Sequence, residues 1–284
     1  MSHELYPEGV MTFAAFAQAL DRVNDARSRF ENFSALIDSG FLCFARRMAL
    51  KPSVGKEIEE RFEAVMSRYQ KAGQRQALAE LFAEMSMAIT GYPGSFLSMA
   101  YQEMELHKLN PSAQQFFTPY PVARSMAEVT IATAELERRV AQRRPLRMGE
   151  PACGAGTFAV AAADTIRERG FDPRSVLLAD LTDKDELCMH MAYLQCWFRE
   201  IPAICRHGNT LTGEVYDWVF TPVVLRQHWA APENAPVDPS QPSPPTVPPP
   251  QEAHGGTDEA PPHGEVELPA SDSRTSQFDL FNAR

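Results

Sequence analysis

The sequence predicts a mixed α/β protein built from three consecutive parts. Apolar residues recur at helical spacing over about the first hundred residues, which predicts an all-helical N-terminal region. From Pro145 onwards, short apolar runs alternate with helical segments, which predicts a parallel sheet with helical crossovers. After Ala230 the chain is rich in proline and acidic residues and cannot bury a core, so we expect a disordered Pro-rich tail. The expected parts are therefore residues 1–110, 111–229 and 230–284.

The helical spacing is clearest in three segments of the N-terminal region. These segments are marked by Phe13, Phe16, Leu20 and Val23, then by Ile58, Phe62, Val65, Met66 and Tyr69, and then by Leu78, Leu81, Phe82 and Met85. A turn is expected at residues 91–94, followed by a helix through Met104 and Leu106. The region is either a packing subdomain or a DNA-contacting lobe, and the lobe would use Arg46, Arg47, Lys51 and Lys56.

The second part has the alternation expected of a sheet with crossovers. In chain order, the sequence predicts a strand at 146–149, a helix at 157–169, a strand at 175–179, a helix at 183–199, a strand at 203–206 and a strand at 217–220. In such sheets, ligands bind at the carboxyl ends of the parallel strands. We therefore expect the functional residues to follow the first, second and third strands directly.

The segment after the first strand has the most informative sequence. It reads Glu150-Pro151-Ala152-Cys153-Gly154-Ala155-Gly156-Thr157-Phe158. Its two glycines permit positive φ and a close backbone approach. The helix that follows begins with unpaired N–H groups, which suit a polar or anionic group. Two glycines alone occur in many turns, but the whole segment is far more specific.

This segment resembles the S-adenosylmethionine-binding motif of adenine-N6 DNA methyltransferases, an acid followed by Pro-Ala-Cys-Gly, then Ser or Thr, then Gly. An upstream segment resembles the same family, in particular the modification subunits of type I restriction systems; it reads Gln115-Phe116-Phe117-Thr118-Pro119, with Val122 and Met126 following. The resemblance covers about residues 110–225. It implies a partial Rossmann-like methyltransferase sheet with S-adenosylmethionine as cofactor.

The resemblance also implies which residues bind the cofactor. They are Phe117, Thr118, Pro119, Glu150, Pro151, Ala152, Cys153, Gly154, Ala155, Gly156, Asp180 and Asn209. Asp180 stands where the family has an acid at the end of the second strand, which accepts hydrogen bonds from the ribose hydroxyls. Asn209 belongs to a segment after the third strand, residues 207–211, that also resembles the family.

The family's catalytic signature is missing from the sequence. In the family it consists of Asn, Asp or Ser, two prolines and an aromatic residue, and it holds a flipped-out adenine. Here the corresponding residues are Phe220-Thr221-Pro222-Val223. The catalytic residues are therefore unknown, with Asn209, Thr221 and Pro222 as candidates.

Two functions remain open after these motifs. One is a methyltransferase acting on adenine N6 in DNA, alone or with a second subunit that supplies catalysis or target recognition. The other is a catalytically degenerate, non-enzymatic accessory or antirestriction factor of a mobile element. The missing signature favours the second function, and the cofactor motifs favour retained binding.

The tail ends in a short apolar motif, Gln277-Phe278-Asp279-Leu280-Phe281. It resembles the bacterial sliding-clamp-binding motif, which implies that Gln277, Leu280 and Phe281 bind the clamp. A disordered tether would set the reach and effective concentration of this peptide. The alternatives are a chance apolar patch and a segment that docks on its own domain.

Charge and cysteine usage limit the class of protein. The net charge is −10, of which residues 230–284 contribute −7 and residues 1–229 only −3, so the folded part is not a basic nucleic-acid binder by composition. The five cysteines form no C-x-x-C pair, so neither a disulfide framework nor a metal site is expected. No apolar run is long enough for a membrane span, and the N-terminus lacks a signal-peptide pattern. We expect a cytoplasmic protein encoded by a bacterium, a phage or a plasmid.

Overall fold

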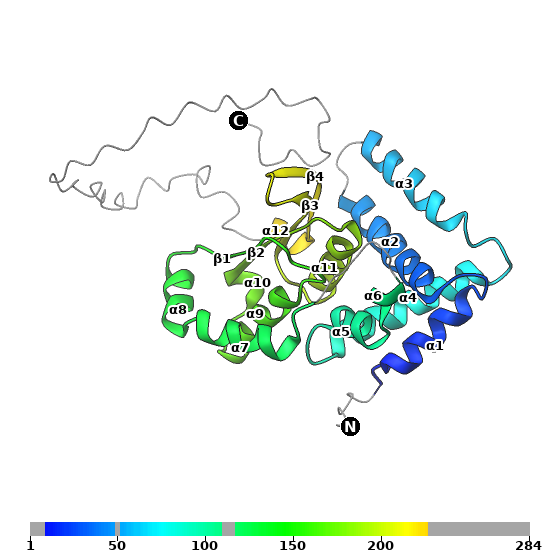
Figure 1. The fold of residues 1–284 in the computed structure, drawn as a ribbon. Helices are drawn as coiled ribbons and strands as arrows, with labels where there is room; N and C mark the ends of the chain where they lie inside the picture. Colours follow the sequence, from blue (N-terminus) through cyan, green and yellow to red (C-terminus); the bar gives the residue numbers. More distant parts are fainter. Residues whose placement is uncertain (1–8, 49–51, 110–116, 227–284) are drawn as a thin grey trace, which may run out of the picture. The chain divides into compact units, whose positions relative to one another are not determined.

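The described part of the chain consists of a helical N-terminal region and a four-stranded sheet with its own helices (Figure 1). The structure is a computed structural model that describes residues 9–48, 52–109 and 117–226. The helices are α1 (Phe13–Val23), α2 (Arg29–Met48), α3 (Pro52–Met66), α4 (Gln74–Gly91), α5 (Phe96–Glu103), α6 (Leu106–Leu109), α7 (Tyr120–Thr130), α8 (Thr133–Ala141), α9 (Thr157–Glu168), α10 (Pro173–Val176), α11 (Glu186–Phe198) and α12 (Pro222–Leu225). The strands are β1 (Leu146–Glu150), β2 (Leu177–Asp183), β3 (Ala203–Asn209) and β4 (Glu214–Phe220). The predicted α/β class and the helical N-terminal region are confirmed.

The N-terminal region is helical for the reasons that its apolar spacing predicts. In α1, the four residues with helical spacing are the ones that are buried: Phe13, Phe16, Leu20 and Val23. The Thr12 hydroxyl caps this helix by accepting a hydrogen bond from the Ala15 N–H. α3 and α4 also lie where the spacing predicts them. The longest helix, α2, was not predicted, and it packs against both α3 and α11.

The sheet has the strand order β1-β2-β3-β4. β1 pairs with β2, and β2 with β3, in parallel, as predicted from the alternation of strands and helices. The predicted strand at 217–220 is β4, which pairs with β3 in the antiparallel direction at the edge of the parallel strands. Only residues 210–213 connect the two strands, and a parallel crossover needs a dozen residues or more.

The second strand is longer than the sequence predicts. It runs to Asp183, so the expectation that it ends at Asp180 is wrong. Asp180 lies within the strand beside Gly149 and Ile204, and its carboxylate forms an ion pair with Arg206 on β3. Side chains alternate between the faces of a strand, so Asp180 and Asp183 point to opposite faces of the sheet.

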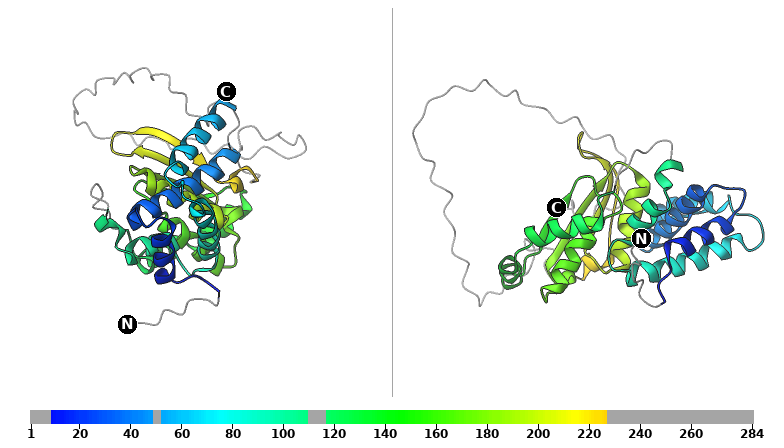
Figure 2. Two further views of the ribbon diagram at one scale, coloured as in Figure 1. Left: turned by 90° about the vertical axis from the view of Figure 1, so that its right-hand side faces the viewer. Right: turned by 60° about the horizontal axis from the view of Figure 1, so that its bottom comes forward.

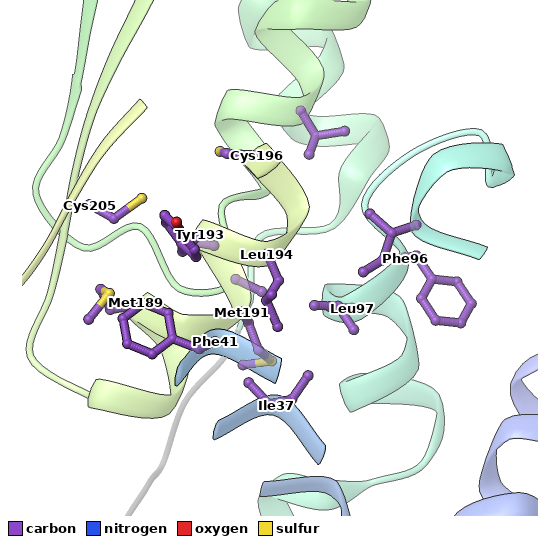
Figure 3. Packing of buried hydrophobic residues seen from close by; sticks show 14 of the residues in the cluster. Ile37, Phe41, Phe96, Leu97, Met189, Met191, Tyr193, Leu194, Cys196 and Cys205 are labelled. Atoms are coloured by element: carbon purple, nitrogen blue, oxygen red, sulfur yellow. The ribbon is translucent and has the colours of Figure 1, made fainter. Parts of the chain in front are cut away.

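α11 is the centre of the core. It packs against β2 and β3 on one side and against α2, α4 and α5 on the other (Figures 1 and 2). Figure 3 shows its apolar side chains between Cys205 of β3, Ile37 and Phe41 of α2, and Phe96 and Leu97 of α5. A helix that is buried on all sides is apolar around most of its circumference, and α11 fits this, with His190 and Gln195 as buried polar exceptions.

Arg199, directly after α11, fastens the helical region to α9. Its guanidinium donates hydrogen bonds to the carbonyl oxygens of Ile89, Tyr92 and Gly94 at 3.3, 3.0 and 3.2 Å. It also pairs with the Asp164 carboxylate on α9 at 2.7 Å, and only 9% of its side chain is exposed. The turn between α4 and α5 is thus tied to two elements of the second part.

No helix in the described residues is both long and apolar enough to cross a membrane.

We predict that Arg199→Met lowers the free energy of unfolding by about 2–3 kcal/mol, because it leaves three carbonyl oxygens without their donor and Asp164 with only Arg167 and Tyr120 as partners. Arg174→Met is the matched control, since Arg174 makes exposed ion pairs with Asp172 and Glu200. Urea denaturation should place the control within about 0.5 kcal/mol of the wild type. Equal losses in the two variants would contradict a special role for Arg199.

Candidate cofactor-binding site

A cavity of about 250 Å³ opens where β1 and β2 end. The residues that line it are Phe117, Thr118, Glu150, Ala152, Cys153, Gly154, Thr157, Phe158, Asp183 and Cys188. Six of these residues were predicted to bind a cofactor, so the sequence motifs converge on one place. The position also agrees with the expected location of ligands at the carboxyl ends of parallel strands.

The turn between β1 and α9 depends on two glycines with left-handed backbone angles. Gly154 has φ of +51° and Gly156 has φ of +81°. A Cβ on Gly154 would lie 2.7 Å from Cδ1 of Phe117, and one on Gly156 would lie 3.1 Å from both Cα and Cβ of Ala192. Gly154 thus lets the Phe117 ring close over the turn, and Gly156 lets α9 begin against α11.

Asp183 holds this turn in place from the end of β2. Its carboxylate accepts hydrogen bonds from the Gly154 N–H at 2.7 Å and from the Asp185 N–H at 2.9 Å. Burial raises the pKa of the Asp183 carboxyl, although both of these N–H groups favour the charged form. The acid at the end of the second strand is therefore Asp183, and Asp180 does not line the cavity.

Glu150 is the second acid of the cavity. Burial raises the pKa of its carboxyl, and the nearby Asp183 charge raises it further. No basic residue is among those that line the cavity in the described chain. Two carboxylates without a cation favour a ligand with hydroxyl, amine or sulfonium groups over one with a phosphate.

Phe117 and Thr118 reach the cavity from the segment before α7. The Phe117 ring is buried and meets the edge of Tyr101, with the ring centroids 5.0 Å apart. Pro119 is exposed, and its carbonyl oxygen accepts hydrogen bonds at the start of α7 from Val122 and Ala123. Gln115 and Phe116, from the same motif, lie outside the described residues.

The other predicted turn residues serve the backbone around the cavity. Pro151 and Ala155 belong to the turn without lining the cavity. The Pro151 carbonyl accepts a hydrogen bond from the Thr210 hydroxyl at 2.6 Å, which ties the turn to the β3–β4 hairpin. Asn209 shapes that hairpin, because its side-chain oxygen accepts the Leu211 N–H at 3.1 Å.

Thr221 and Pro222 lie at the opposite end of the sheet from the cavity. The Thr221 side chain is buried, and its hydroxyl donates to the Ile201 carbonyl at 2.8 Å and accepts from the Ala203 N–H at 3.0 Å. These partners stand at the amino end of β3, because the antiparallel β4 carries the chain away from the cavity. The structure therefore does not bring the catalytic candidates Thr221 and Pro222 to the site.

Sequence reasoning missed four residues of the cavity: Thr157, Phe158, Asp183 and Cys188. Asp183 could have been found, because the alternation of apolar residues continues through Leu181 and places the end of the strand after it. Burial raises the pKa of the Cys153 and Cys188 thiols well above the ordinary value, so both are protonated packing groups at neutral pH.

The other predictions concern a clamp-binding peptide, a DNA-contacting set and metal binding. The clamp-binding residues Gln277, Leu280 and Phe281 lie outside the described residues, as does Lys51 of the expected DNA-contacting set. In that set, Arg46 pairs with Glu59 and Lys56 pairs with Glu60. No group of acidic, histidine and cysteine side chains in the described ranges could hold a metal ion.

Comparisons with known proteins give distant structural likeness but no match in sequence. No protein-family model matches the chain, and no curated protein matches it significantly. Among solved structures, the chain is similar to a protein of Listeria monocytogenes provisionally assigned as a class I S-adenosylmethionine-dependent methyltransferase, at 15% identity and a TM-score of 0.37. The match covers 67% of this chain and 51% of that chain, so this chain spans about half of its length.

We predict that Gly156→Ala is more destabilising than Gly170→Ala by about 1–3 kcal/mol. The two glycines share nearly the same φ, +81° and +83°, but only Gly156 has a neighbour, Ala192, that an added Cβ would meet. The backbone strain is therefore matched, and the difference isolates the contact between the turn and α11. Urea denaturation of both variants measures this difference in the free energy of unfolding. Equal destabilisation of the two variants would show that α11 moves to accommodate the added methyl group.

Proposed function

We propose that the chain binds S-adenosylmethionine in the cavity at the carboxyl ends of β1 and β2. The observation that carries the proposal is the acid-lined turn: Glu150 and Asp183 face a cavity without a basic lining residue, beneath a glycine turn that an added Cβ would fill. A nucleotide phosphate would be repelled by these carboxylates, whereas a ligand with a sulfonium, an amine and ribose hydroxyls suits them.

The roles of the residues follow from their positions. Asp183 accepts hydrogen bonds from ribose hydroxyls, in the role that the sequence analysis gave to Asp180. Glu150 balances the positive charge of the ligand, and the Phe117 ring covers the turn. When bound, the cofactor supplies an activated methyl group. At about 250 Å³ the cavity is smaller than most sites that enclose a whole ligand, so part of the cofactor extends over the rim.

The finer assignment is to the adenine-N6 DNA methyltransferase group, with DNA as the partner. It is supported by the two sequence motifs, which meet at one cavity. A catalytically degenerate accessory or antirestriction factor is the second candidate, and the burial of Thr221 at the far end of the sheet favours it. A radiolabelled methyl-transfer assay on mixed-sequence DNA separates them, since robust turnover by the chain alone excludes the degenerate function.

The test of cofactor binding is calorimetric titration of the chain with S-adenosylmethionine, S-adenosylhomocysteine and ATP. We predict saturable binding of the first two and none of ATP. Gly154→Val should abolish binding, because its side chain would collide with Phe117 and fill the turn. Gly170→Val is the control for backbone strain, since Gly170 also has a positive φ but a Cβ added there would meet no neighbouring atom within 4 Å. Binding of ATP alone, or no binding by the folded wild type, would overturn the proposal.

We predict that affinity for S-adenosylmethionine falls as the pH is lowered from 8 to 5. Glu150 and Asp183 have raised pKa values, so they take up protons at a higher pH than ordinary carboxyls and then lose their charge. The stability of the ligand-free chain changes in the opposite direction and rises as the pH is lowered. A raised pKa in the folded state adds stability below the unfolded pKa, and this contribution is lost as the pH rises through the folded value.

Glu150→Gln provides the matched test of this pH dependence. The variant should bind more weakly at pH 8, show a flatter pH profile, and melt at a higher temperature than the wild type when ligand-free at that pH. Titration calorimetry and thermal melting at each pH measure both quantities. An unchanged pH profile of binding in the variant would show that Glu150 does not contribute to ligand binding.

We also propose that residues 277–281 bind the host's sliding clamp. Burying Leu280 and Phe281 gains roughly 1.5–3 kcal/mol per side chain before ordering costs, so we predict a micromolar dissociation constant, about −8 kcal/mol. Leu280→Ala combined with Phe281→Ala should abolish clamp binding without changing the melting of the chain. If deletion of residues 277–284 leaves clamp association intact in a pull-down, the motif is a coincidence.

A further inference from the structure

A buried polar cluster links the cofactor turn to the helical region. It consists of Ser95 before α5, Thr157 at the start of α9 and Gln195 on α11, and these residues are at most 4% exposed. The Ser95 hydroxyl lies 3.2 Å from both Gln195 Oε1 and the Thr157 hydroxyl. The three residues are far apart in sequence, so the cluster exists only in the folded chain.

The Gln195 side-chain amide uses all of its hydrogen-bonding capacity in this cluster. Its Nε2 donates to the Ala155 carbonyl and to the Ser95 hydroxyl, the latter at 3.0 Å. Its Oε1 accepts from the Ser95 hydroxyl at 3.2 Å and from the Leu97 N–H at 3.3 Å. A side-chain amide offers two donors and an oxygen with two lone pairs, so no apolar residue of the same size could replace it here.

Two of these contacts lead directly to the cavity. Ala155 stands between Gly154 and Gly156, the two left-handed glycines of the turn. Thr157 lines the cavity, and its hydroxyl donates to Ser95 instead of turning toward solvent. The cluster therefore holds the turn at the Ala155 carbonyl, while Asp183 holds it at the Gly154 N–H.

The turn needs such support because glycine is conformationally free. Gly154 and Gly156 can adopt many backbone angles, and fixing them when a ligand arrives would reduce its affinity. A turn fixed before the ligand arrives avoids this loss. The same amide accepts the Leu97 N–H and so caps α5, which has no cap from its own Ser95 side chain.

We propose that Gln195 is a positioning residue that fixes the turn at residues 152–157 in its ligand-receptive form, with Ser95 extending this control to Thr157. The inference rests on the proposed function for its ligand, S-adenosylmethionine. It makes the helical N-terminal region a structural part of the cofactor site, because Ser95 and Leu97 come from that region. Gln195 itself does not line the cavity.

The test uses the full chain, Gln195→Met, Ser95→Ala and the control Asp38→Ala. Asp38 pairs with His190 at 2.8 Å, so the control also breaks a contact between α11 and the helical region but leaves the turn untouched. For each protein, titration with S-adenosylhomocysteine gives the dissociation constant, thermal melting gives stability, and hydrogen exchange of peptides spanning 150–158 reports on the turn.

For Gln195→Met we expect a rise in the dissociation constant of about tenfold and clearly faster exchange in the turn, from the loss of several buried hydrogen bonds. Ser95→Ala keeps the hydrogen bond from Gln195 to Ala155, so it should raise the dissociation constant only about threefold. This variant replaces Gln195→Met as the test if Gln195→Met does not fold. Asp38→Ala should lower the melting temperature while its dissociation constant stays within about twofold of the wild type.

The inference is overturned if Gln195→Met and Ser95→Ala melt earlier but bind and exchange like the wild type, since the cluster would then be only structural. It is also overturned if Asp38→Ala weakens binding as much as Gln195→Met does. If the wild type binds no S-adenosylhomocysteine, the proposed function fails. Hydrogen exchange in the ligand-free turn then still decides whether Gln195 fixes it.

Discussion

The burial of α11 on every side is the constraint on which the rest of the structure depends. Every residue from Cys188 to Cys196 is buried, between the sheet on one side and the N-terminal helices on the other. In such a place a polar side chain without partners costs free energy of folding. His190 meets Asp38, Gln195 meets Ser95 and Ala155, and Arg199 follows the helix with three carbonyl partners. The polar groups of this segment therefore decide how the two parts of the chain fit together.

The candidate site takes its geometry from the same helix. The turn after β1 rests on α11 through the close approach of Gly156 to Ala192, and Asp183 fixes both the turn and the residue that caps α11, Asp185. Partial burial of Glu150 and Asp183 raises their pKa values, so these two acids lower the stability of the ligand-free chain at neutral pH. The two half-buried carboxylates of this cavity have no basic residue among its described lining residues, and such perturbed acids are common at functional sites.

The sequence predicts those parts of the fold that depend on local patterns. α1, α3 and α4 follow from apolar spacing, and the β1 turn follows from its glycines. α2 was missed because Asp38, Ser39 and Gly40 interrupt its apolar residues, yet Gly40 is where the Phe82 ring packs. Which acid faces the cavity depends on where β2 ends: the apolar alternation through Leu181 indicates a strand that runs past Asp180, and pairing with β3 carries it to Asp183.

The direction of β4 shows how a motif can stand in the right order along the chain and still lie in the wrong place. Thr221 follows the fourth strand, as the catalytic signature does in the methyltransferases that the sequence resembles. In a parallel strand this position would meet the cavity, but the four-residue hairpin reverses the strand and leaves Thr221 bonded to Ile201 and Ala203. What the hairpin does bring to the rim is its own tip, through Thr210 and the Pro151 carbonyl. Any group that acts on a bound cofactor must therefore come from this tip, from the lining residues or from a partner, and not from the end of β4.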